Sequence, residues 1–371
     1  MRPARLEDLQ TATATRREAG APRQDPAVNA VLGLQRGAGN RAVAGVLARR
    51  AEKPQGTGLR DDAAIGRYVR KAVIFWRNNP TAELFHLANF LGAAANTELN
   101  LLGVPDVKVH VNEHGPGGAS FHADGWYMVI NGVTRDENVH TLGELDEDTV
   151  AIAAMSVYHE ARHAEQRFRV ARMQAGEGEE IGFPMDEEVA KAAAKAPLDP
   201  RTMPVQERRE ARAWKTNTLG EDAGYRDAVM TWMDEVKSAA RDVRDVAGEH
   251  GREPEELRKA IGRIFTSWTS SGALMAIREH LPSAQRRKNA TIIGDITLMD
   301  QRFQAAETAW KAIPAQPARS DFSVLAGALR ELVRAIDRAY HDQPVEHDAH
   351  EAGGATFNAF HTALKKHDSH R

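Results

Sequence analysis

Two histidines and a glutamate stand close together in the segment His159-Glu160-Ala161-Arg162-His163, inside a long run of residues with a helical pattern. Residues four apart lie on one face of a helix, so both imidazoles can bind one divalent ion, and this spacing is typical of zinc sites. Glu160 is expected beside the metal, where it would take a proton from a bound water. The motif therefore predicts a zinc site for hydrolysis, with His159 and His163 as ligands and Glu160 as the general base.

A motif this short also occurs by chance. In that case the two histidines pack or face solvent on an ordinary helix, and Glu160 pairs with a neighbouring arginine. The flanking residues favour the metal site, because apolar positions upstream predict a buried helix and a strand pattern precedes it.

A catalytic zinc site needs a third protein ligand and one open position. The chain has no cysteine, and positions 164–173 contain no histidine, so a distant carboxylate must complete the site. Two E-x-x-A segments offer one, and their small alanines would let a second helix approach closely. The candidates are Glu346 and Glu210, followed by Asp348 and Glu207. Arg162 and Gln166 are expected behind the ligands, where they would orient them.

The order of helical and strand patterns predicts an α+β fold that is mostly helical, with a short antiparallel sheet. The H-E-x-x-H motif on its active-site helix makes the expected fold zincin-like. We expect a leader over 1–57, in which 1–28 are disordered and 29–50 form a short helical hairpin, and a catalytic domain over 58–371. A strand is expected over 107–111, and Asp124-Gly125 predicts a hairpin before a strand over 126–131. That last strand, if it lies at the sheet edge, could bind an extended peptide; the alternative is a plain core hairpin. Helices are expected over 61–93, from 146–148 to 176, and over 187–196, 205–215, 224–247, 254–269, 295–312 and 321–341.

The C-terminal region is rich in histidine. Such a run can bind metals, but an exposed polar tail is the simpler expectation. The histidines are His341, His347, His350, His361, His367 and His370.

Composition narrows the class of protein. Of the 371 residues, 42% are hydrophobic and 27% are charged, and the net charge is −3, which favours a globular protein and gives no reason to expect nucleic acid as a partner. No apolar run has the length of a membrane span, and the N-terminal residues lack the apolar region of a secretory signal, so we expect synthesis in the cytoplasm.

Three segments resemble a known group of proteins. Leu34-Gln35-Arg36, Ala38-Gly39-Asn40, Ala42-Val43 and Val46-Leu47 resemble the LQR-x-AGN-x-AV-x-x-LL leader of actinobacterial proteins associated with extracellular contractile injection systems. Residues 158–172 are similar to the HEARHAEQ-x-FR-x-AR helix of zinc peptidases from that group, and 340–353 are similar to their Y-x-x-x-P-x-E-x-DA-x-x-x-G segment. The resemblance implies a zincin fold, hydrolase activity and Glu346 as the third ligand. It also implies that 29–50 bind the injection particle, which would export the protein as cargo.

We therefore predict a zinc metallopeptidase that acts on a protein or peptide as an effector or toxin of a contractile injection system. One alternative is a non-catalytic structural or adaptor component of the particle. Another is a zinc amidohydrolase that acts on a non-protein amide.

Overall fold

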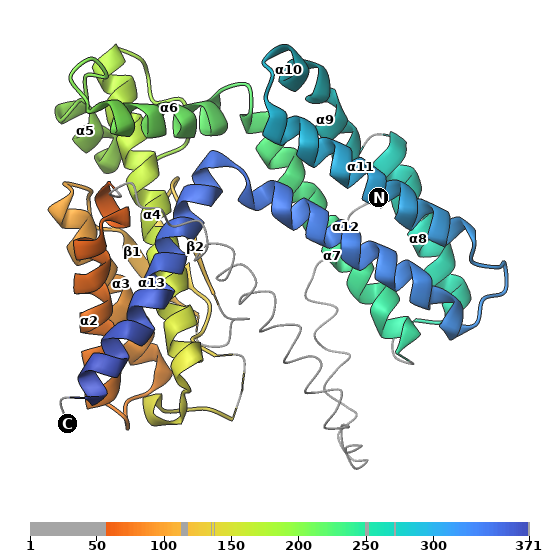
Figure 1. The fold of residues 1–371 in the computed structure, drawn as a ribbon, viewed down its shortest axis with the longest axis horizontal. Helices are drawn as coiled ribbons and strands as arrows, with labels where there is room; N and C mark the ends of the chain where they lie inside the picture. The colour runs from red at the N-terminus through yellow and green to blue at the C-terminus, as the bar shows by residue number, and fades with distance from the viewer. Residues whose placement is uncertain are drawn as a thin grey trace. The chain divides into compact units, whose positions relative to one another are not determined.

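The computed structural model describes residues 57–112, 118–134, 136, 138–248, 252–270 and 272–369. These residues belong to Lys53–Arg371, one of the two units into which the chain divides. They form mostly helices with one small sheet, which confirms the coarse prediction of a mostly helical α+β class (Figure 1). The predicted leader, with its segment 29–50, lies outside the described residues except for Thr57.

Two helices replace the single helix predicted over 61–93. They are α2 (Asp62–Asn78) and α3 (Leu84–Leu101). Asp61 caps α2, because its side chain accepts from the N–H of Ala63 at 2.8 Å. The prediction was wrong because Pro80 stands two residues after the end of α2; proline cannot donate a backbone hydrogen bond and disfavours a helical conformation of the residue before it, Asn79.

The sheet is mixed rather than antiparallel. Its strands are β1 (Lys108–Val111), β2 (Ala119–His122) and β3 (Tyr127–Ile130), in the order β1-β3-β2. β2 pairs antiparallel with β3, as the hairpin signal predicted, but β1 pairs parallel with the other side of β3. The predicted strand over 126–131 therefore holds the centre of the sheet and not its edge, because both of its sides are hydrogen-bonded.

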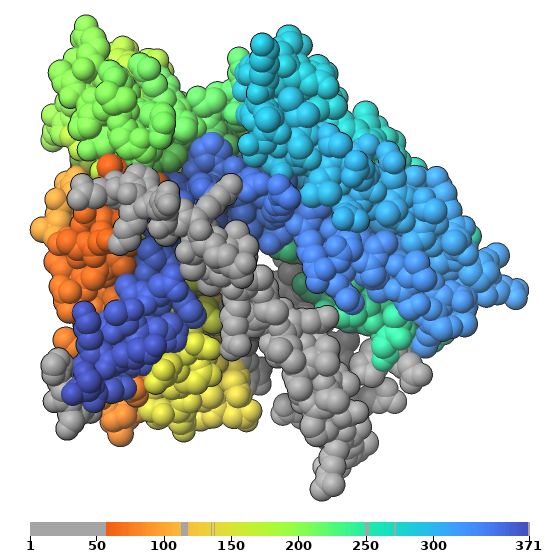
Figure 2. Space-filling view, viewed as in Figure 1, coloured from red at the N-terminus to blue at the C-terminus, as the bar shows by residue number. Residues whose placement is uncertain are grey.

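Helix α4 (Glu147–Glu177) carries the H-E-x-x-H residues and confirms the helix predicted up to 176. Asp146 caps its start, and Gly178 ends it in the left-handed conformation with φ 74°. α4 packs against α3, β2 and the last helix, α13 (Pro344–Asp368). Figure 1 shows α13 running beside α2 and α4, and the space-filling view shows its surface (dark blue) between α2 (orange) and residues near the start of α4 (yellow) (Figure 2). Two segments far apart in the sequence thus form one helical layer.

The C-terminal histidines do not form a polar tail. His341 ends α12, while His347, His350, His361 and His367 lie on α13; His370 lies outside the described residues. The tail prediction was wrong because α13 buries a narrow stripe of mostly small residues. Polar residues separate these positions in the sequence, so no apolar run indicates a buried helix. That stripe consists of Val345, Ala349, Ala352, Gly353, Thr356, Phe360 and Leu364.

The later helices α7 to α12 form a second hydrophobic core, in which Trp232, Phe265 and Phe303 pack together. The helices predicted over 224–247, 254–269, 295–312 and 321–341 are present with shifted ends, and two short helices, α9 and α10, were not predicted. The bounds of the remaining helices are α5 (Glu187–Lys195), α6 (Val205–Leu219), α7 (Ala223–Ala247), α8 (Pro254–Ser270), α9 (Ala273–Glu279), α10 (Leu281–Arg286), α11 (Ala290–Lys311) and α12 (Ser323–His341). Among all these described helices, none combines the length and the apolar character that crossing a membrane requires.

Candidate metal centre

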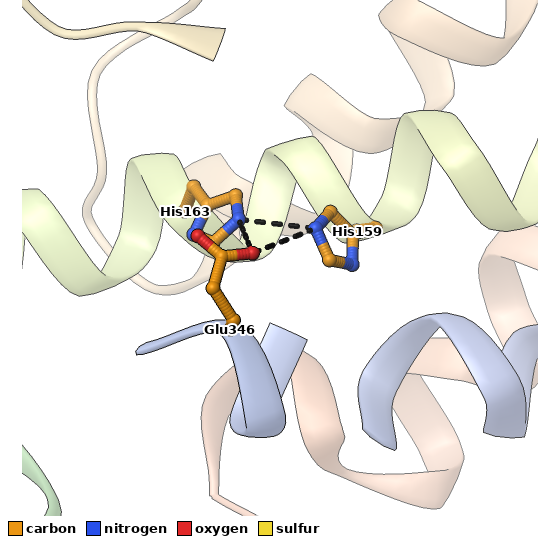
Figure 3. Close-up of side chains that lie close together, drawn as sticks. All are labelled: His159, His163 and Glu346. Atoms are coloured by element: carbon orange, nitrogen blue, oxygen red, sulfur yellow. Dashed lines mark hydrogen bonds and ion pairs between the residues drawn. The ribbon is translucent and has the colours of Figure 1, made fainter. Parts of the chain in front are cut away.

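Three side chains from two helices converge on one point (Figure 3). His159 and His163 lie one turn apart on α4, and Glu346 comes from the first turn of α13. The Nε2 atoms of the two histidines are 3.0 Å apart. The Oε2 atom of Glu346 lies 3.4 Å from Nε2 of His163 and 3.7 Å from Nε2 of His159. The structure therefore brings together the two motif histidines and the carboxylate from far along the chain.

The separations suit a tetrahedral metal ion. Ligand bonds of about 2.0–2.1 Å at tetrahedral angles place neighbouring ligand atoms about 3.3 Å apart, close to the three observed values. Oε2 of Glu346 is buried and has no hydrogen-bond partner among the described residues. A buried acceptor that faces two imidazole nitrogens without a proper hydrogen bond would be satisfied by a shared cation. The three residues thus fit zinc in number, chemistry and spacing.

Gln166 fixes the tautomer of His163. The Gln166 Nε2 group donates to the carbonyl of Val345 at 2.9 Å and to Oδ2 of Asp348 at 2.7 Å. Its Oε1 atom is therefore the acceptor that faces Nδ1 of His163 at 2.9 Å, and Nδ1 carries the proton. This leaves the lone pair of Nε2 directed at the proposed metal position, as a ligand histidine requires.

Behind Gln166 lies a buried ion-pair network. Arg162 is fully buried and donates to Asp348 from Nε at 2.7 Å and from Nη2 at 3.2 Å, and it also pairs with Glu165. Burial alone would raise the pKa of Asp348, but the Arg162 guanidinium, with Arg60 behind it, lowers that pKa to about 2. Asp348 is therefore a charged anchor that holds the first turn of α13, and with it Glu346, against α4.

Glu160 lies beside the cluster and is held by the sheet. Its Oε2 atom accepts from the backbone N–H of Phe121 at 2.8 Å, while Oε1 lies 3.9 Å from Nε2 of His159. The N–H of Asn131 donates to Gly118, so in this antiparallel pair the backbone groups of Phe121 point away from β3. Burial raises the pKa of Glu160, although the two histidines oppose the rise. The edge strand at the site is therefore β2, not the predicted 126–131.

The other predicted carboxylates do not join the histidines. Glu210 on α6 accepts from Thr57 Oγ1 at 2.8 Å and from Gln206 at 2.7 Å. Oε2 of Glu207 lies 3.6 Å from Nη1 of Arg169, and Asp348 forms an ion pair with Arg162. Glu210, the alternative third ligand, therefore makes hydrogen bonds elsewhere and does not lie with the two histidines.

Two residues near the cluster had no assigned role in the sequence. Burial and the charge of Glu346 raise the pKa of the Tyr340 hydroxyl at the end of α12. The His350 ring centroid lies 4.4 Å from that of His159 and 3.8 Å from that of His341. Burial and these two neighbours lower the pKa of His350 to about 2. His350 stands one helical turn after Glu346, and that spacing is the signal that could have placed it here.

No family model, no curated protein and no solved structure matches this chain. The chemistry of the centre therefore follows from its own residues.

Proposed function

We propose that the protein is a zinc-dependent peptidase in which His159, His163 and Glu346 hold the metal and Glu160 is the general base. The observation that carries the proposal is the buried Oε2 atom of Glu346, which lies 3.4 and 3.7 Å from two imidazole nitrogens and has no hydrogen-bond partner in the described part of the chain. Two histidines and a carboxylate form a common catalytic ligand set for zinc. The placement of the motif helix beside a sheet and the third ligand on a later helix support a zincin-like architecture.

Each residue of the site has its own role in the proposed hydrolysis. Zinc supplies Lewis acidity and a bound water of lowered pKa. Glu160 accepts a proton at Oε1, because Oε2 is occupied by the N–H of Phe121. Its raised pKa makes the ionised carboxylate a stronger base toward the bound water than an ordinary glutamate. Tyr340 is a hydroxyl donor near Glu346 and remains protonated at neutral pH, as stabilisation of a developing negative charge requires.

A peptide is the substrate class that the surroundings favour. β2 is an edge strand beside Glu160, and an extended chain can add to such an edge through backbone hydrogen bonds. The resemblance of 158–172 and 340–353 to zinc peptidases supports the same class. The resemblance of 29–50 to a cargo leader supports a role as an effector of a contractile injection system.

Glu160→Gln tests the function. The variant should bind one zinc ion per chain, measured by elemental analysis, while its cleavage of a mixed peptide library falls at least about 1,000-fold. Glu188→Gln is the matched control, because Glu188 is exposed on α5 and should leave both properties unchanged. Cleavage by Glu160→Gln at the wild-type rate would refute the general base.

The same assay separates the alternatives. A wild-type protein that binds zinc but cleaves neither peptides nor other amides would indicate a structural component. Cleavage confined to non-peptide amides would indicate an amidohydrolase.

A further inference from the structure

Arg167 continues the row of metal-binding side chains along α4. It stands four residues after His163, as His163 stands four residues after His159, so the three share one helix face. Four residues rise about 6 Å along a helix, which places Arg167 one turn beyond the cluster. The charge of Glu346 acts on its guanidinium, which agrees with a position on the metal side of α4.

Unlike its neighbours on the helix, Arg167 has no polar partner among the described residues. Arg162 pairs with Asp348, Arg169 pairs with Glu165, and Arg172 donates to the carbonyl of Ala196. For Arg167, the described residues offer neither a hydrogen bond nor an ion pair, although its side chain is half-buried.

A second cation, Arg226 on α7, adds to the electrostatic cost of burying Arg167. Burial and then the charge of Arg226 on α7 lower the pKa of Arg167 to about 10. Arg226 itself pairs with the adjacent Asp227 at 2.8 Å, and the charges of Glu346 and Asp227 partly oppose the fall in the pKa of Arg167. A half-buried cation under the influence of a second cation is costly unless an anion binds to it.

An aromatic ring holds the guanidinium and leaves its edge free. The guanidinium carbon lies 5.2 Å from the ring centroid of Phe183, in the connection between α4 and α5. Stacking uses one face of the guanidinium, so the N–H groups along its edge remain available. That edge matches the two oxygens of a carboxylate.

We propose that Arg167 is a specificity-determining residue that binds a carboxylate of the substrate beside the metal ligands. The proposal rests on the peptidase function and narrows its substrates to peptides that present a carboxylate near the scissile bond. That carboxylate comes either from a free C-terminus or from an Asp or Glu side chain. A site built to pair with an anion rejects the neutral analogue strongly, because its cation then stays unpaired.

Two peptide pairs test the proposal and separate the sources. One pair differs only in a free C-terminal carboxylate against an amide, and the other differs in an internal Glu against Gln. For the preferred acidic member, Arg167→Gln should lower kcat/KM at least about 100-fold, and for its neutral partner less than about threefold. Arg167→Lys should restore part of the loss, because lysine keeps the charge but not the bidentate edge. Arg172→Gln is the matched control, since it changes an arginine of the same helix whose hydrogen bond goes to Ala196.

A binding measurement separates this site from the peptidase function. N-acetyl-alanyl-alanine and its amide would be titrated calorimetrically into the full chain, with zinc and after chelation. Tighter binding of the acid that Arg167→Gln weakens at least about tenfold supports the carboxylate site, even if no peptide is cleaved. Equal binding of acid and amide, together with equal losses for both members of each peptide pair in Arg167→Gln, would overturn it.

Discussion

A single carboxylate oxygen distinguishes the cluster from a pair of histidines on a helix surface. Oε2 of Glu346 is buried and, in the described part of the chain, has no hydrogen bond of good geometry, but it lies beside the Nε2 atoms of both histidines. Without a metal, burial lowers the pKa of His163 but the charge of Glu346 raises it to about 9, so a metal ion would have to displace the proton from Nε2. The cluster is therefore arranged for positive charge, and a divalent ion would supply it.

Removal of this oxygen should abolish tight metal binding. We expect Glu346→Ala to weaken zinc affinity at least about 100-fold, because two imidazoles alone leave the ion with too few protein ligands. Glu210→Ala is the control for the alternative ligand and should change the affinity less than about threefold, since Glu210 pairs with Thr57 and Gln206. Competition with a chromogenic chelator measures both. A larger loss in Glu210→Ala than in Glu346→Ala would reverse the assignment.

At this scale, the local part of the candidate site could be predicted and the distant part could not. The spacing of His159, Glu160 and His163 fixes their common helix face without any tertiary information. Glu210 and Glu346 carry the same E-x-x-A signal, so the residues alone left both open. Only the packing of α13 on α4 brings Glu346 to the histidines.

At the scale of elements, a short turn before α2 contacts both α4 and α13, the helices that carry the candidate ligands. Over Gly58–Arg60 the chain forms a 3₁₀ turn, in which the N–H of Leu59 donates to Glu165 on α4 at 2.9 Å. The next residue, Arg60, donates to Asp348 on α13 at 2.9 Å. The turn thus holds α4 and α13 from one side while Gln166 bridges them from within.

Gly58 is the position in this turn that tolerates no side chain. Its φ is +63°, and a Cβ atom there would lie 1.8 Å from Oε1 of Glu165, which is buried in the ion-pair network. We expect Gly58→Ala to lower the free energy of unfolding by about 2–4 kcal/mol in chemical denaturation. Gly294→Ala should instead raise it by about 0.5–1 kcal/mol, because Gly294 lies within α11 with open space around it. If Gly58→Ala changed the free energy of unfolding by less than about 0.5 kcal/mol, the turn would accommodate a side chain at this position, against the prediction.

The elements themselves were predicted unevenly, for physical reasons. α4 has capping residues at both ends, Asp146 and Gly178, so its bounds follow from local residues. The position of β1 beside β3 depends on a crossover, which no local pattern encodes. α13 buries small residues such as Ala349 and Ala352, which stand between histidines and acids in the sequence, so its composition is typical of an exposed polar tail.

At the scale of the whole molecule, two hydrophobic cores carry different polar groups. The first core includes residues of α4 and α13, the helices that also carry the buried ion pairs beside the candidate metal cluster. The second, formed by α7 to α12, contains a buried carboxylate, Asp295 on α11, for which no ion-pair partner exists among the described residues. Burial and then the nearby Asp342 raise the pKa of Asp295 to about 6, while Arg338 opposes the rise only weakly.

Asp295 should make the second core less stable as the pH rises. In the unfolded chain an aspartate titrates near its ordinary pKa of about 3.9, so between about pH 4 and pH 6 the folded state binds more protons, and the free energy of unfolding falls as they are lost. Asp295→Asn removes the charge, and we expect it to raise the free energy of unfolding by about 2 kcal/mol at pH 8 and hardly at all at pH 3.5. Urea denaturation at the two pH values measures the difference, with Asp234→Asn as the control because Asp234 is exposed on α7. Equal effects of Asp295→Asn at both pH values would show that the carboxylate is compensated in the fold, since only an uncompensated buried charge links stability to its own titration.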